Sequence, residues 1–138
     1  MLPKPDDLHS LLIRTDFRND ATWKAVQAAV QAASVEGFRA NLNIIDDRRF
    51  DQLTIPQLLA LVPKDPESTF LFLADSVTLE SPEHPVLVVD LWEQPGRTFR
   101  VIPRQMWAVQ NNLVIANASW EDFADLVDAD GIFRDPPR

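Results

Sequence analysis

Short apolar runs that alternate with helical segments are the feature of this sequence that most constrains its fold. Three such runs occupy residues 11–14, 40–45 and 70–74. Their nearly continuous apolar character is typical of strands that are covered on both faces of a sheet. Because a helical segment separates the first two runs, we expect a parallel βαβ unit with a right-handed crossover.

Helical spacing is clearest between the first two runs. Residues 19–23 resemble a capped helix start, and the alanine-rich stretch up to residue 33 places Trp23, Val26 and Val30 on one face. A shorter helix is predicted to begin at Thr54, since proline is tolerated in the first turn that follows. Together with the third run, these segments predict a parallel βαβαβ portion.

The pattern changes after the third run. Residues 76–84 show no helical signal and are too few for a crossover helix, so the run 86–92 is predicted to lie antiparallel to the third strand. A Pro95–Gly96 turn then leads to residues 98–102, which are expected to complete a hairpin.

The C-terminal part is predicted to be mostly helical. We expect a short helix over 103–110, an edge strand over 113–116, and a last helix that opens with the capping-box-like residues 119–122 and ends at Gly131. The apolar side chains that this last helix is expected to bury are Phe123, Leu126 and Val127.

The predicted fold class is therefore α/β, with a mixed sheet. An N-terminal parallel βαβαβ portion is followed by an antiparallel hairpin and C-terminal helices. No repeat or linker divides the 138 residues, so we expect a single domain over 1–138. Residues 1–8 and 134–138 are expected to fray.

Composition excludes several classes of function. Cysteine is absent and two histidines occur, which excludes thiolate chemistry and a multi-histidine metal centre, and no cofactor is predicted. The net charge of −8 argues against nucleic-acid binding, and no apolar run approaches the roughly 20 residues that span a bilayer. Because no signal-peptide pattern occurs, we expect a cytoplasmic protein that binds neither nucleic acid nor membranes. Its oligomeric state is left open.

Acidic residues follow four of the predicted strands. In an open parallel sheet the carboxyl ends of the strands share an edge, and ligands bind in the crevice outside it. We therefore expect one rim with the candidate residues Asp16, Asp46, Asp47 and Asp75, whereas Asp90 should lie apart. Oxygen-rich clusters suit Mg²⁺ or Ca²⁺. Aspartate also caps turns and helices at such positions, so a structural interpretation stays open beside the ligand-binding one.

Two further groups of residues are candidates for binding. His84 lies in a loop near the predicted rim, where it could act as a base or as a hydrogen-bonded turn residue. Around the hairpin, arginines could bind an anion or a partner, and tryptophans could line a pocket or pack in the core. The residues of this second group are Trp92, Arg97, Arg100, Arg104 and Trp107.

Six segments, spread over nearly the whole chain, carry a resemblance to a known family. They are residues 11–17, 58–63, 84–91, 96–101, 112–117 and 128–134. These segments resemble an uncharacterised family of small actinobacterial proteins. The resemblance supports a single domain, and it implies no activity, cofactor or catalytic residue.

No motif in the sequence names a reaction. The glycines are isolated, so phosphate-binding loops and a nucleophile elbow are absent. Small size and acidic charge favour a non-catalytic interaction module, immunity-like or regulatory, that binds a basic protein partner. The alternative is a small-molecule or divalent-metal-binding domain, which could be enzymatic, that uses the aspartate-rich edge.

Overall fold

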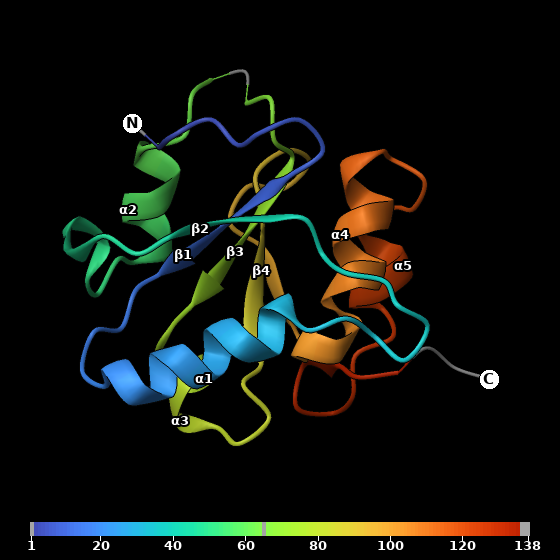
Figure 1. Ribbon diagram of the computed structural model, residues 1–138. Helices are drawn as coiled ribbons and strands as arrows, with labels where there is room; N and C mark the ends of the chain where they lie inside the picture. The colour runs from blue at the N-terminus through green and yellow to red at the C-terminus, as the bar shows by residue number, and fades with distance from the viewer. Residues whose placement is uncertain (1, 65, 136–138) are drawn as a thin grey trace.

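The computed structural model describes residues 2–64 and 66–135, which form a six-stranded sheet with helices on both faces (Figure 1). The strands are β1 (Ser10–Arg14), β2 (Leu42–Ile45), β3 (Phe70–Ala74), β4 (Val86–Asp90), β5 (Thr98–Val101) and β6 (Ile132–Phe133). Their order in the sheet is β2-β1-β3-β4-β5-β6. β1 is parallel to β2 and β3, β4 is antiparallel to β3 and β5, and β6 is parallel to β5. This arrangement confirms the predicted fold class.

The helices of the parallel portion begin at the expected residues. In α1 (Asp20–Gln31) the side chain of Asn19 accepts a hydrogen bond from the N–H of Thr22 at 3.0 Å. In α2 (Ile55–Ala60) Thr54 and Gln57 form a complete capping box. Such caps satisfy backbone N–H groups that have no partner within the helix, which is why these starts can be predicted from sequence.

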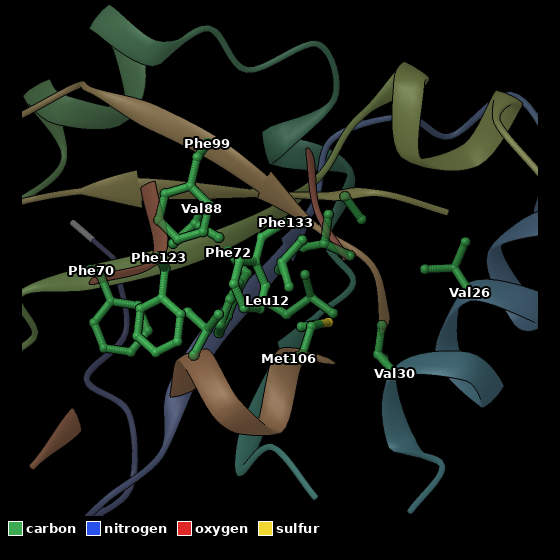
Figure 2. Close-up of a cluster of buried hydrophobic side chains, with 14 of the residues drawn as sticks. Leu12, Val26, Val30, Phe70, Phe72, Val88, Phe99, Met106, Phe123 and Phe133 are labelled. Atoms are coloured by element: carbon green, nitrogen blue, oxygen red, sulfur yellow. The ribbon is translucent and has the colours of Figure 1, made fainter. Parts of the chain in front are cut away.

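Side chains of successive strand residues point to opposite faces of the sheet, and each face has its own core. Leu12 and Phe72 belong to the larger core, to which α1, α4 (Met106–Val114) and α5 (Glu121–Ala124) contribute; Figure 2 shows part of it, including Met106. Leu11 and Leu71 belong to the smaller core beneath α2 and the 3-10 helix η1 (Arg48–Phe50). The helical layer over this second face is thin, because α2 and η1 are both short.

One segment that we expected to be free of helix contains a helical turn. Residues 76–84 include α3 (Ser76–Glu80), whose capping box joins Asp75 and Thr78. A single capped turn is too short to show helical periodicity, so the sequence pattern did not reveal it. The antiparallel direction of β4 was nevertheless predicted correctly, because one turn cannot span a crossover.

The C-terminal prediction was wrong in three places. Residues 103–114 form the 3-10 helix η2 (Pro103–Gln105) followed by α4, so the strand expected over 113–116 does not exist and β6 is the edge strand instead. The last helix, α5, ends at Ala124 rather than at Gly131. Leu126 consequently lies outside the helix, and it is 40% exposed instead of buried.

The described parts of both ends make contacts with the rest of the fold. The N–H of Asp6 donates to Asn43 Oδ1 at 2.7 Å, and Arg134 forms an ion pair with Glu83 at 2.8 Å. Met1 and residues 136–138, for which fraying was also expected, lie outside the described residues. Within the described ranges, no helix is both long and apolar enough to pass through a membrane.

Candidate functional site

The structure brings the four predicted rim carboxylates to the same edge of the sheet. Asp46 and Asp47 directly follow β2, Asp16 follows β1, and Asp75 follows β3; these three strands are adjacent and parallel. Asp90 ends the antiparallel β4 opposite Phe70, the first residue of β3, so it lies at the other edge. The parallel crossovers place these four carboxylates together. The contacts of each carboxylate then determine whether it is free to bind a ligand.

Asp16 is enclosed by the arginine that follows it. Its side chain is buried, and Arg18 donates from Nη2 to Oδ2 at 2.6 Å and from its backbone N–H to Oδ1 at 3.0 Å. These hydrogen bonds from Arg18 hold the pKa of Asp16 below its ordinary value. Arg18 also pairs with Glu80 at 2.7 Å. A hollow of about 420 Å³ lies beside Asp16, Arg18 and Glu80. The Asp16 carboxylate that borders this hollow is already engaged in the ion pair with Arg18.

Asp46 is a partner of a buried arginine that sequence reasoning missed. The guanidinium of Arg14 lies 4.2 Å from the centre of the Phe17 ring and donates to Asp46 at 3.3 Å and to Asp20 at 2.8 Å. Trp23 Nε1 also donates to Asp46, at 3.2 Å. A buried guanidinium requires such partners because an unpaired charge in the interior is costly. Asp46 therefore stabilises Arg14.

Asp47 caps the 3-10 helix η1. It accepts the N–H of Arg49 at 2.9 Å and the Nε of the same residue at 2.9 Å. The backbone hydrogen bond is the main cause that lowers the pKa of Asp47. This contact matches the capping interpretation of the sequence.

Asp75 and Arg100, which the sequence placed in two separate candidate groups, are partners. Arg100 donates to both oxygens of Asp75, at 2.9 and 2.7 Å, in bidentate geometry. Burial by itself raises the pKa of Asp75, but the hydrogen bonds from Arg100 and Thr78 outweigh burial and leave the pKa below its ordinary value. The same carboxylate also caps α3.

His84 is held by a backbone contact. Its Nδ1 lies 3.0 Å from the carbonyl oxygen of Thr78, which can only accept, so Nδ1–H donates this hydrogen bond. With Glu83 and Arg104 it borders a hollow of about 290 Å³ near the end of α1. Among the described residues, no group of three or more His, Asp or Glu side chains is arranged to hold a metal ion.

The predicted group of arginines and tryptophans does not form one patch. Arg97 pairs with Asp90 at 2.6 Å at the edge where β4 ends, near the exposed Trp92. Arg104 and Trp107 follow β5, which ends at the opposite edge, and Trp107 of α4 stacks on Phe38, in the segment before β2, with ring centres 4.8 Å apart. Arg100 and Arg104 both have acidic partners, Asp75 and Asp135.

A surface that the sequence did not indicate as a site lies around α5. Its acidic residues are Glu83, Glu121, Asp122, Asp125, Asp128 and Asp130, and its basic residues are Arg97 and Arg134. Arg134 joins Glu83, Asp128 and Asp130 at 2.6 to 2.8 Å, and Arg97 reaches Glu121 at 2.9 Å. We call these residues, with Leu126, the acidic C-terminal surface. The clustering of acids over 121–130 was visible in the sequence, but the expectation of a buried helix there concealed its exposure.

Comparison with known proteins gives the family and no activity. No curated protein matches the chain. A family described as a domain of unknown function, DUF6924, matches residues 9–136, which include every strand of the sheet. The chain therefore belongs to the DUF6924 family.

Proposed function

We propose that this domain is a non-catalytic interaction module that binds a basic protein partner through the acidic C-terminal surface. The observation that carries the proposal is the charge balance of this surface, where six carboxylates accompany two arginines. The excess of four negative charges is half of the net charge of −8. Such a concentration of one sign attracts an oppositely charged partner and speeds its association.

The carboxylates at the strand edge are less suited to this role. Asp16 and Asp75 are tied to Arg18 and Arg100, so a partner would have to break these ion pairs before it could use them. On the acidic C-terminal surface, Asp122 and Asp125 are exposed and form no ion pair with any described residue. Their charge is available without that cost.

Leu126 gives the acidic C-terminal surface an apolar element. Its side chain is 40% exposed among the carboxylates. Stable protein interfaces combine an apolar centre with a polar rim, so a partner that presents basic residues around an apolar side chain would fit this surface.

A matched pair of double variants tests the proposal. Asp122→Asn with Asp125→Asn removes two charges from the surface, whereas Glu36→Gln with Asp51→Asn removes two exposed charges elsewhere. Host proteins retained on each immobilised variant at low salt are compared by mass spectrometry. We expect a basic protein that wild type and the control retain and that the surface variant loses.

Binding kinetics of that protein provide the quantitative test. Removing surface charges should lower the association rate several-fold and leave the dissociation rate nearly unchanged, and added salt should reduce the difference. Equal losses for both double variants, or no retained basic protein, would refute the proposed surface.

The metal-binding alternative has less support because the strand-edge carboxylates are paired with arginines. We further propose that the domain and its partner meet in the cytoplasm of an actinobacterial host, as the composition and the resemblance led us to expect. Fractionation of host cells, followed by detection of the chain, tests this location.

A further inference from the structure

A cavity of about 360 Å³ lies on the face of the sheet that α2 covers. Leu11, Leu71 and Leu91 form its floor, from β1, from β3 and from the position after β4. Residues 2–5, 62–63 and 66–68 contribute its walls, and Figure 1 shows these segments at the same end of the sheet. This end is opposite the one that carries the rim carboxylates, so the cavity is separate from them.

The lining offers few groups that could form hydrogen bonds with a ligand. Four of the wall residues, Pro3, Pro5, Pro63 and Pro66, have no backbone N–H, and the floor is aliphatic. An apolar cavity of roughly 150 Å³ is large enough to hold benzene, and small-molecule pockets begin at about 300 Å³. The cavity is therefore large enough for an apolar body that is larger than benzene.

Two charged side chains border the cavity, and they determine which polar group such a ligand can carry. Lys4 Nζ lies 3.0 Å from Glu67 Oε2, and both side chains are 69% exposed. A hydroxyl group can accept a hydrogen bond from the ammonium and donate one to the carboxylate. The pair is neutral overall, so a ligand carboxylate or ammonium is repelled by one member about as strongly as it is attracted by the other, and it gains nothing that offsets the loss of its hydration.

We propose that this cavity binds a small neutral amphiphile. Its apolar body lies on the leucine floor, and its hydroxyl end lies beside the Lys4–Glu67 pair, within reach of both charged groups. This site is independent of the acidic C-terminal surface, so either assignment can fail without the other.

Three probes with the same chain and different polar ends test the ligand class on the purified full chain. 1-Octanol, octanoate and octylammonium are titrated while the methyl NMR signals of Leu11 and Leu71 are followed. We expect saturable shifts with 1-octanol and at least threefold weaker binding of each ion. Absence of saturable shifts with 1-octanol, or equal affinity for all three probes, overturns the proposal.

Two variants test the geometry. Val62→Phe places a larger side chain in the cavity wall and should weaken 1-octanol binding at least tenfold, whereas Val77→Phe on α3, at an exposed position outside the cavity, should not change it. Glu67→Gln removes the repulsion and should tighten octanoate binding at least threefold. Unchanged binding by either Val62→Phe or Glu67→Gln refutes the proposed pose, and the wild-type titration decides the proposal if a variant does not fold.

Discussion

Replacing Asp75 with asparagine tests whether the bidentate pair with Arg100 stabilises the edge where β3 ends. Asparagine is as good a helix N-cap as aspartate, so the capping of α3 should persist. The charge-assisted bonds to Arg100 are the contacts that change. Each hydrogen bond to a charged group contributes about 1.5–3 kcal/mol, and the asparagine oxygen can still accept one of the two. We therefore expect the free energy of unfolding to fall by about 2 kcal/mol.

Urea unfolding followed by circular dichroism measures this loss, which corresponds to a decrease in Tm of about 7 °C for a chain of this size. Asp47→Asn is the matched control, because Asp47 is also an N-cap paired with an arginine. Its side chain and that of Arg49 are 39% and 71% exposed, against 25% and 19% for Asp75 and Arg100. Water screens the exposed pair, so the control should lose clearly less stability than Asp75→Asn does. Equal losses for the two variants would refute the claim that burial makes the Asp75 pair the stronger one.

Three further predictions concern pH and buried polar groups. The pKa values of Asp16, Asp75 and Asp90 lie below their ordinary value in the folded protein, so the unfolded chain binds protons first as the pH falls. The stability that these groups contribute is complete above about pH 5 and decreases below about pH 4, and a urea midpoint unchanged at about pH 3 would contradict this. Gln110→Leu leaves buried polar groups near β1 without partners and should cost about 2 kcal/mol in urea unfolding, whereas a neutral result would show that water replaces the amide. Arg14→Lys keeps the positive charge but loses the planar guanidinium that contacts two carboxylates. Thermal unfolding should therefore show a loss of about 2 kcal/mol in the free energy of unfolding. An unchanged Tm would mean that the charge alone is enough to stabilise this contact.

The parallel portion of the fold was predictable because its signals are local. Asn19 and Thr54 mark helix starts through contacts with residues three positions away, and the apolar strands between the helices are continuous. The end of α4 could not be predicted in this way. Val114 is β-branched and favours a strand, but the buried side chains of Met106, Val109 and Gln110 continue a helical face, and packing outweighs local preference there.

The candidate site was less predictable because its contacts join distant parts of the sequence. The shared edge of Asp16 and Asp75 follows from the topology, which the sequence pattern indicates. The arginine partner of Asp75 is a different matter, because Arg100 lies 25 residues later, and Glu83 likewise meets Arg134, 51 residues later. Sequence patterns give no partner for a charge across such separations. The contact of Asp47 is local, because its partner Arg49 lies two residues away.

The position of β6 has a consequence for the order in which the sheet can form during synthesis. β1 to β4 can pair as soon as their own residues have left the ribosome, but β5 has its second neighbour only after residues 132–133 appear. Until then one side of β5 has free N–H and C=O groups, which are a template for pairing with another chain. We expect the nascent protein to be most prone to misassociation in this interval. The interval ends when the two residues of β6 pair with β5.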